Sequence, residues 1–291
     1  MLLILLNVVG PVFLVSFVGY LWGVTKRPFD AGVFSVIASS VGTPCLVIDA
    51  LSTAGLKLDQ FAVMGGGSVL CVAFSLALGW LTVKLTRQPV ATYLPSLVFA
   101  NTGNMGLPLA SFAFGADGLG LAMAYFAVNT VFNFTIGQGL AARKLTLLEV
   151  VRSPLVWSTL LGAGLSVTNT ALPLVIARAL HILGGLTIPM MLLALGVSLS
   201  KLKVTSMNRA LLFSVVRLAG GFGIGWLVAW MMGLEGLSRG ALVLQSAMPA
   251  AVYNYMFAAR YNNQPEEVAG VVVVSTLMSI IALPVFLWTV M

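Results

Sequence analysis

Ten long apolar stretches, separated by short polar turns, constrain this chain more than any other feature of its sequence. A membrane-spanning helix takes about 20 apolar residues. In lipid every backbone group must find a partner within the protein, which favours helices. The sequence therefore predicts an all-α membrane protein with ten transmembrane helices. The expected spans are residues 2–24, 31–54, 61–83, 91–113, 117–140, 153–169, 173–200, 210–233, 237–259 and 266–290.

The composition supports this interpretation. Apolar residues make up 59% of the 291-residue chain and charged residues only 8%, whereas soluble domains carry about 25% charged residues. This composition excludes a water-soluble enzyme, a nucleic-acid-binding protein and a disordered regulator. The partner that it predicts is the lipid bilayer, and we expect no nucleic acid.

The basic residues predict the orientation of the chain, because positively charged loops are retained on the cytoplasmic side of a membrane. If successive loops alternate between the two sides, eleven of the fifteen Lys and Arg residues fall on the side that follows the first span. Lys57 and Arg239 fall on the opposite side. We therefore expect the first side to be cytoplasmic and both termini to lie outside.

The two halves of the sequence show an internal repeat. Two pairs of prolines are separated by the same 145 residues, namely Pro28 with Pro173 and Pro44 with Pro189. This offset maps the first five spans onto the last five, and an odd number of spans per half makes the halves oppositely oriented. We therefore expect two inverted repeats, residues 1–145 and 146–291, which is an architecture of secondary transporters.

The fourth and ninth spans are interrupted in their middle by residues that disfavour a lipid-facing helix. Asparagine and glycine are poor helix formers, and proline lacks an amide and clashes with the preceding turn. The interruption runs from Asn101 to Pro108 in the fourth span and from Gln245 to Asn254 in the ninth. Broken backbone at this depth is tolerated where protein buries it or where it lines a water-filled cavity.

If the two interruptions meet at the repeat interface, two half-helix N-termini would present unpaired amides and about half a positive charge each, which suits an anion. Neutral side chains would add hydrogen bonds to a small carboxylate. The alternative is a pair of proline kinks filled by packing, with the polar groups bonded to their own helices. The polar candidates are Asn101, Thr102, Asn104, Gln245, Ser246 and Asn254.

Asp49 lies in an otherwise apolar run of the second span, where an ionisable group is costly and by default functional. It could carry a proton or bind a cation, or it could pair with a neighbour such as Arg217 near the end of its span. Asn129 and Asn133 are four residues apart in the fifth span and so share one helix face. They could line the cavity or bond neighbouring helices. The candidates for ion or proton coupling are Asp49, Asn129 and Asn133.

Signatures of enzymatic chemistry are missing from the sequence. It contains no HExxH zinc helix, no GxxxxGK[ST] phosphate loop and no GxSxG nucleophile elbow. With a single histidine, there is almost no material for a histidine-based proton relay. We therefore expect neither an enzyme nor a bound metal or cofactor.

The interrupted spans resemble the auxin efflux carrier family, which contains the plant PIN transporters and bacterial relatives that include permeases for malonate and malate. The resemblance rests on FANTGNMGLPL (99–109), on SAMPAAVYNYMFAARYN (246–262) and on the context of Pro44. It covers essentially the whole chain, and its most specific part is the Asn-Thr-Gly-Asn-x-Gly-x-Pro run. It implies the fold of the bile acid:sodium symporters, in which the fourth and ninth spans cross.

The resemblance also implies a scaffold domain and a transport domain, each drawn from both repeats, with an elevator-like motion and a homodimeric assembly. The expected location is the bacterial inner membrane, with both termini on the periplasmic side. The crossover residues that the resemblance carries over to this chain are Asn101, Thr102, Gly103, Asn104, Pro108, Pro249, Tyr253 and Asn254.

These features predict a secondary transporter or facilitator of small organic anions, such as auxin-like indole acids or dicarboxylates of the malonate and malate type. Two alternatives stay open. One is a membrane sensor or partner subunit that uses the same fold without transport, and the other is a sodium-coupled symporter of the bile-acid type. The sequence also leaves open whether a proton or a sodium ion accompanies the substrate.

Overall fold

A computed structural model of the chain describes residues 2–29, 33, 36–53, 58–143, 154–168, 170–202 and 204–290. The predicted boundary between the two halves, at residue 145, lies outside the described residues. So do four of the basic residues used to predict the orientation, which are Lys57, Lys144, Arg152 and Lys203.

The described residues are almost entirely helical, and the prediction of an all-helical membrane protein is confirmed. In the list that follows, η denotes a π-helical turn. The segments are α1 (Leu2–Val24), η1 (Ala38–Gly42), α3 (Thr43–Thr53), α4 (Leu58–Thr86), α5 (Val90–Val98), η2 (Thr102–Gly106), α6 (Leu107–Phe132), η3 (Asn133–Gly137), α7 (Gln138–Ala142), α9 (Pro154–Val167), α10 (Leu174–Lys201), α11 (Met207–Met231), α12 (Gly236–Ser246), α13 (Val252–Arg260) and α14 (Pro265–Val290).

Among the described residues, five helical stretches are long and apolar enough to cross a membrane. They are Asp59–Thr86, Thr102–Ala142, Leu174–Lys201, Met207–Met231 and Pro265–Val290. Each of the ten predicted spans contains helix, but some of them are divided into shorter pieces, because the fourth and ninth spans are broken in their middle. The number of membrane crossings therefore stays a prediction.

The longest of these stretches changes direction at Gly115. This residue has a non-helical backbone (φ 68°, ψ −158°), which lies in a region that glycine adopts readily. A Cβ placed on Gly118 would lie 3.4 Å from the carbonyl oxygen of Ala110, eight residues earlier. Such proximity is impossible in a straight helix, so the chain folds back here. The two arms correspond to the end of the fourth predicted span and to the fifth.

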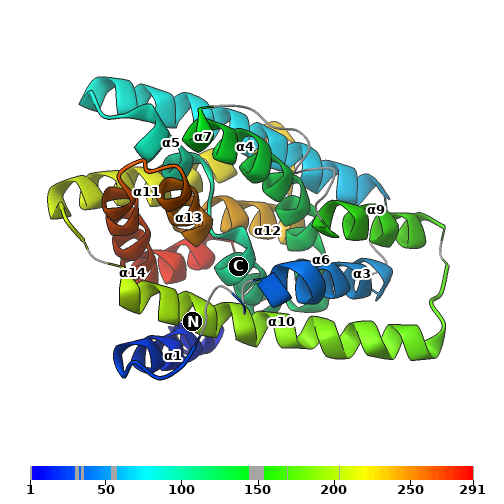
Figure 1. The fold of residues 1–291 in the computed structure, drawn as a ribbon. Helices are drawn as coiled ribbons and strands as arrows, with labels where there is room; N and C mark the ends of the chain where they lie inside the picture. Colours follow the sequence, from blue (N-terminus) through cyan, green and yellow to red (C-terminus); the bar gives the residue numbers. More distant parts are fainter. Residues whose placement is uncertain are drawn as a thin grey trace.

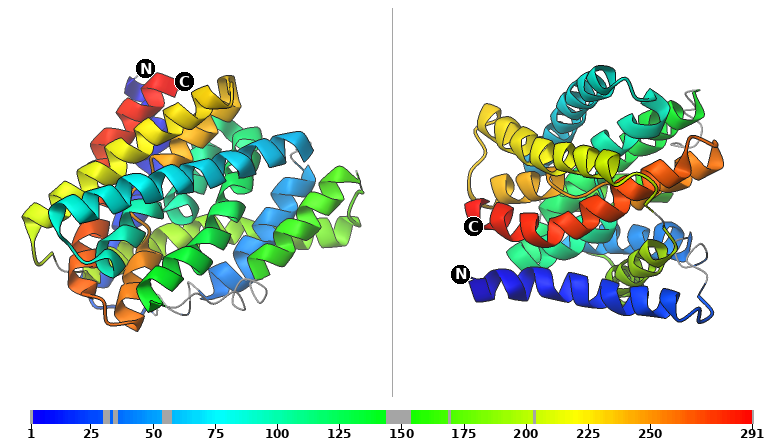
Figure 2. Two further views of the ribbon diagram at one scale, coloured as in Figure 1. Left: turned by 90° about the horizontal axis from the view of Figure 1, so that it is seen from above. Right: turned by 90° about the vertical axis from the view of Figure 1, so that its left-hand side faces the viewer.

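The helices form two groups (Figures 1 and 2). In the first, called the α1/α10 group, α1 lies along α10, and η1 and α3 pack against α9 and α10. The second, called the crossover group, contains α4 to α7 and α11 to α14 together with η2 and η3. Each group draws helices from both halves of the chain.

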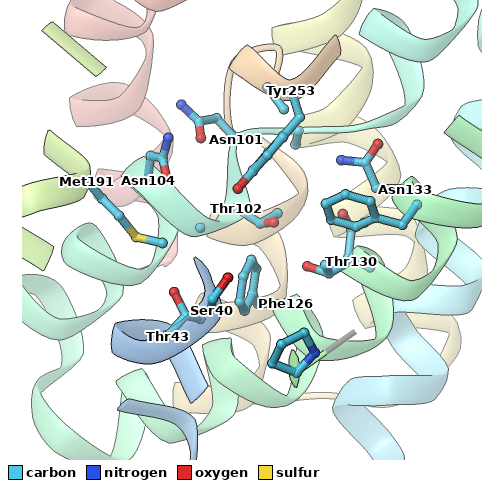
Figure 3. A pocket seen from close by; sticks show the side chains of 16 residues that line it. Ser40, Thr43, Asn101, Thr102, Asn104, Phe126, Thr130, Asn133, Met191 and Tyr253 are labelled. Atoms are coloured by element: carbon cyan, nitrogen blue, oxygen red, sulfur yellow. The ribbon is translucent and has the colours of Figure 1, made fainter. Parts of the chain in front are cut away.

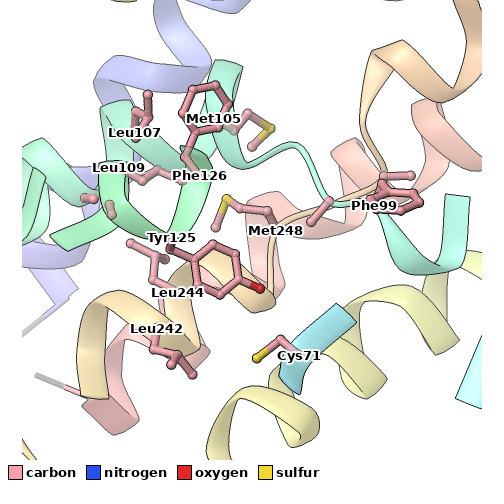
Figure 4. Packing of buried hydrophobic residues seen from close by; sticks show 14 of the residues in the cluster. Cys71, Phe99, Met105, Leu107, Leu109, Tyr125, Phe126, Leu242, Leu244 and Met248 are labelled. Atoms are coloured by element: carbon pink, nitrogen blue, oxygen red, sulfur yellow. The ribbon is translucent and has the colours of Figure 1, made fainter. Parts of the chain in front are cut away.

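Glycines allow close packing within the α1/α10 group. A Cβ on Gly19 of α1 would collide with the backbone of Leu193, and a Cβ on Gly196 of α10 would collide with the backbone of Ser16. Small residues that let helix backbones approach closely are typical of helix contacts in membrane proteins. The hydrophobic core, in contrast, is centred on the broken spans of the crossover group, where Phe99 and Met248 are completely buried (Figure 4).

Candidate functional site

The fourth and ninth predicted spans are both broken, and the two breaks lie side by side. In the first break, α5 ends at Val98 and η2 begins at Thr102; in the second, α12 ends at Ser246 and α13 begins at Val252. Residues Ala100 and Ala250 form an antiparallel β-bridge. The sequence therefore identified the two spans that are interrupted, and the structure brings the interruptions together.

Two backbone hydrogen bonds hold the breaks against each other. The amide of Asn101 donates to the carbonyl oxygen of Pro249 (2.7 Å), and the amide of Ala251 donates to that of Phe99 (3.1 Å). Ala250 is held further by its amide, which donates to the hydroxyl of Ser275 on α14 (3.1 Å). Because buried backbone groups must be paired, this small ladder lets extended chain persist inside the crossover group.

The position of the first break differs from the expected one. Pro108 was expected to interrupt the fourth span, but the non-helical residues are Phe99 to Asn101, and Pro108 lies inside the helical run that begins at Thr102. The π-helical turn η2 directly precedes Pro108, and local π adjustments of this kind let a membrane helix re-satisfy the backbone groups that proline frees. Pro249, in contrast, does lie within the second break. The bridge also pairs positions 150 residues apart, five more than the offset of the proline repeat.

A cavity of about 240 Å³ lies where the crossed breaks face the α1/α10 group (Figure 3). The crossover group contributes both breaks and the α6–η3 arm, while Ser40, Thr43, Pro154 and Met191 come from the α1/α10 group. The lining residues are Ser40, Thr43, Ala100, Asn101, Thr102, Gly103, Asn104, Phe126, Asn129, Thr130, Asn133, Phe134, Pro154, Met191, Ala251 and Tyr253.

The electrostatics of this cavity come from helix ends and neutral polar groups. None of the described residues that line it is charged. The N-terminal ends of η2 and of α13 both begin at its wall, through Thr102 and through Ala251 and Tyr253. Helix N-termini carry partial positive charge and free amides. One of these amides, that of Thr102, is bonded to the carbonyl of Ala100 (2.8 Å).

Three buried side-chain atoms of the cavity lining have no hydrogen-bond partner among the described residues. They are Nδ2 of Asn101, Oδ1 of Asn133 and Oγ1 of Thr43, on residues that are only 4%, 6% and 2% exposed. An unsatisfied buried polar atom costs about 1–3 kcal/mol. The first is a donor and the second an acceptor, so a ligand that carries both kinds of group could satisfy them. Asn104 is half-buried at the same wall.

A second cavity, of about 200 Å³, adjoins the first. Asn104, Met191 and Tyr253, labelled in Figure 3, line both cavities. The second cavity extends along the last turns of α10 to Ser198 and Lys201. Both cavities lie between the two helix groups.

Five of the predicted site residues do not line the first cavity. Gln245, Ser246, Asn254 and Pro249 bond to the protein instead, and Pro108 packs inside the crossover group. The bonds run from Gln245 Nε2 to the Ala122 carbonyl (3.2 Å), from Ser246 Oγ to the Gly221 carbonyl (2.7 Å) and from Asn254 Nδ2 to the Phe99 carbonyl (2.9 Å). The acceptors lie on other segments of the chain, whereas the packing alternative considered above had the polar groups bonded to their own helices.

Of the candidates for ion coupling, some line the first cavity and others do not. Asn129 and Asn133 both line the first cavity. Asp49 lies outside it, and its Oδ2 is 3.0 Å from Nδ1 of His181, a residue whose side chain is 80% exposed. Arg217, considered as a partner of Asp49, instead donates to carbonyl oxygens of the crossover. Among the described residues no cluster of three or more His, Cys, Asp or Glu side chains could hold a metal ion.

The sequence alone missed the contribution of the α1/α10 group to the cavity. Ser40 and Thr43 come from the turn η1 and the start of α3, and Met191 comes from the middle of α10. A signal was available, since Thr43 and Met191 lie close to Pro44 and Pro189, the pair of prolines that defined the repeat. Phe126, Thr130 and Phe134 could have been inferred from their spacing with Asn129 and Asn133.

Comparison with known proteins gives a consistent picture. The family described as "Membrane transport protein" matches the chain over residues 4–144 and 138–287. An uncharacterized transporter of Methanocaldococcus jannaschii is 22% identical over 97% of this chain and 98% of its own length. An uncharacterized transporter of Methanothermobacter thermautotrophicus is 27% identical over 65% of this chain and 64% of its own length.

A plant protein is similar over a shorter region. Auxin efflux carrier component 1 of Arabidopsis thaliana is 28% identical over 48% of this chain, and the matched region is 23% of the plant protein. The chain thus spans about a quarter of this relative.

Proposed function

The chain belongs to the membrane transport protein family that includes the auxin efflux carriers, and from this membership we propose that it is a secondary transporter or facilitator of small organic anions. The observation that carries the proposal is the meeting of two helix N-termini at one cavity. The transport role follows from the family. The nature of the substrate and the mechanism are inferred from the geometry of the site.

The chemistry of the cavity favours a small organic acid. Helix N-termini bind anions through amides and dipoles without needing a basic side chain. Asn101, Asn104 and Thr102 offer hydrogen bonds to a carboxylate, while Phe126 and Met191 offer apolar contact to its carbon skeleton. At about 240 Å³, the cavity lies below the roughly 300–1,000 Å³ of drug-sized sites, which supports dicarboxylates such as malonate or malate, or a compact indole acid.

We further propose an elevator-type mechanism, in which the crossover group carries the anion past the α1/α10 group. The cavity lies between these two groups, so that relative movement could open it first to one side and then to the other. In the proposed architecture ten spans form two inverted repeats, 1–145 and 146–291. The two stretches matched by the family, one in each half of the chain, support this division.

The proposal places the chain in the bacterial inner membrane with both termini outside, since basic residues gather in loops of the opposite side. It also includes a homodimer and leaves a proton or a sodium ion as the possible coupling partner. Asn129 and Asn133, which face the cavity, are then the nearest groups for such an ion. Asp49 is a weaker candidate, because it lies outside the cavity and contacts His181.

Transport by the purified protein in liposomes tests the function. We expect saturable flux of labelled malonate, malate or indole-3-acetate. We expect Asn104→Leu to reduce it by at least about tenfold, because the substitution removes a hydrogen-bonding side chain from the wall of both cavities. Asn208→Leu is the matched control, since Asn208 is exposed at the start of α11. It should transport like the unmodified protein.

The outcomes separate the open alternatives. Binding of an organic acid without flux would indicate a sensor or partner subunit. Flux that requires sodium would indicate a symporter. The proposal would be overturned if none of the three acids binds or is transported, in protein whose cooperative thermal unfolding shows that it is folded.

A further inference from the structure

Arg217, on α11, is the largest completely buried side chain of the described residues, with 2% of its surface exposed. It lies next to the crossed breaks but does not line either of the two cavities described above. A charged group in a membrane interior is expensive unless it is paired. The groups that pair with this guanidinium therefore indicate what Arg217 does at the crossover.

The guanidinium binds three backbone carbonyl oxygens. Nη1 donates to Leu97 (2.6 Å) and Val98 (3.1 Å), and Nη2 donates to Ser246. Leu97 and Val98 are the last two residues of α5, and Ser246 is the last residue of α12. The Nε atom is buried and has no hydrogen-bond partner in the described part of the chain. One side chain thus joins the C-terminal ends of the two half-helices that precede the breaks.

Carbonyl groups at the C-terminal end of a helix are stabilised by a nearby cation. The last carbonyls of a helix have no intrahelical donor, and the helix dipole adds about half a negative charge at that end. Two such ends meet at the crossover, and their partial charges repel each other. The ion pairs within the described residues are His181–Asp49 and Arg209–Glu267, so the helix ends, rather than a carboxylate, compensate the charge of Arg217.

The surroundings are shaped for this arrangement. A Cβ on Gly221, one turn after Arg217, would collide with Nη2 of Arg217 and with the carbonyl oxygen of Ser246. The hydroxyl of Ser246 donates to the Gly221 carbonyl (2.7 Å), which fixes α12 against α11. A planar guanidinium presents several donors in a fixed geometry, which suits acceptors arriving from two helices better than the compact ammonium of lysine.

In transporters with discontinuous helices, half-helix C-termini and unwound carbonyls commonly coordinate a sodium ion or a proton. Here the guanidinium already binds those ends. We propose that Arg217 is a positioning residue that acts as a fixed internal cation: it takes the place of a bound cation between α5 and α12, and so assembles the anion site without one. The inference rests on the proposed transport function, because only there does the assembled crossover hold an anion.

The first test uses the unmodified protein. Its thermal unfolding midpoint should be the same in sodium chloride and in choline chloride of equal ionic strength. Any shift of the midpoint caused by malonate should also be the same in both salts. A sodium-specific rise in the midpoint, or a malonate shift that requires sodium, would overturn the proposal.

The second test changes the residue. Arg217→Gln keeps polar atoms but loses the charge, and it should reduce transport on the order of a hundredfold and lower the unfolding midpoint, since removing one partner of a buried charged contact is strongly destabilising. Arg217→Lys should retain part of both. Arg178→Gln, at an exposed position on α10, is the control and should change neither.

A rescue experiment separates charge from packing. Methylguanidinium added to Arg217→Ala should raise its unfolding midpoint, whereas the neutral analogue N-methylurea should not, and neither should affect Arg178→Ala. Equal rescue by both compounds, or normal stability of Arg217→Gln, would contradict a role as a cation.

The two proposals can fail separately. The unfolding and rescue measurements need no substrate. If no organic acid is transported, the proposed transport function is contradicted, but these measurements still test whether Arg217 acts as an internal cation. If the Arg217 variants do not insert into the membrane, the salt comparison on the unmodified protein still decides.

Discussion

The two breaks of the crossover look alike in the sequence, but their polar side chains have different surroundings in the structure. In the first break, Asn101 and Asn104 face the cavity, and Asn101 leaves a donor without a partner. In the second, Gln245, Ser246 and Asn254 donate to carbonyl oxygens of other segments and do not line the first cavity, and the amide oxygens of Gln245 and Asn254 have no partner among the described residues. The side chains of the first break therefore face the cavity, whereas those of the second donate their hydrogen bonds to the fold.

This division has a physical reason. A buried break exposes more backbone groups than one short ladder can satisfy, and each unsatisfied group costs free energy. Side chains of the second break provide hydrogen bonds to backbone groups of other segments. Asn254, for example, donates to the carbonyl of Phe99 in the first break. The side chains of Asn101 and Asn104 therefore stay available at the cavity, although the amides of Asn101 and Thr102 are hydrogen-bonded within the protein.

The strongest test of the difference is Asn101→Leu. We expect it to weaken binding of the transported acid by about a hundredfold, because a ligand oxygen would lose its donor in a buried site, while the free energy of unfolding changes little. Calorimetric titration with malonate and denaturation in detergent measure the two quantities. Loss of stability without loss of affinity would assign the first break to the fold as well.

The reverse pattern is expected for Gln245→Leu. Gln245 is completely buried and donates to the Ala122 carbonyl on α6, so the substitution should lower the free energy of unfolding by about 1–3 kcal/mol. The dissociation constant of the acid in the folded fraction should stay unchanged. A Kd that rises as much as for Asn101→Leu would show that both breaks bind the ligand.

A smaller effect is expected at the ladder itself. Ser275→Ala removes the hydroxyl that accepts from the amide of Ala250, and the net loss of one such hydrogen bond should be about 1 kcal/mol. Thermal unfolding measures it, with Ser200→Ala on α10 as a control outside the crossover. A neutral result would mean that the two bridge hydrogen bonds suffice to hold the breaks together.

The smallest effect is expected at Asp49→Asn, remote from both breaks. The contact of Asp49 with His181 is largely exposed on the histidine side, and such ion pairs contribute about 0–1 kcal/mol. Transport and its dependence on pH should be unchanged. A pH profile that shifts in this variant would restore Asp49 as a proton-coupling residue and extend the functional region beyond the first break.

Much of this organisation was predictable from the sequence. Apolar length identified the helical segments, and the clusters around Asn101 and Pro249 identified both breaks, because polar and helix-breaking residues in the middle of a span have few other uses. Family resemblance placed the two breaks together, and the bridge between Ala100 and Ala250 agrees with it.

Other features depend on contacts between distant parts of the chain and could not be predicted. The role of Arg217 became visible only when the ends of α5 and α12 met at its guanidinium. The same holds for the breakpoint at Phe99 to Asn101 rather than at Pro108, since pairing with the second break decides where the chain is extended. Helix propensity indicates which segment forms a helix poorly, and tertiary hydrogen bonds determine which of its residues are non-helical.

The bridge also has a consequence for how the protein is made. The amide of Asn101 and the carbonyl of Phe99 pair with residues near Ala250, and these are synthesised about 150 residues later. At roughly 5–20 residues per second, the ribosome needs about 8–30 seconds to supply them. For that time the nascent first half must shelter an open break, in contact with water or with the insertion machinery, before the lipid can close around it.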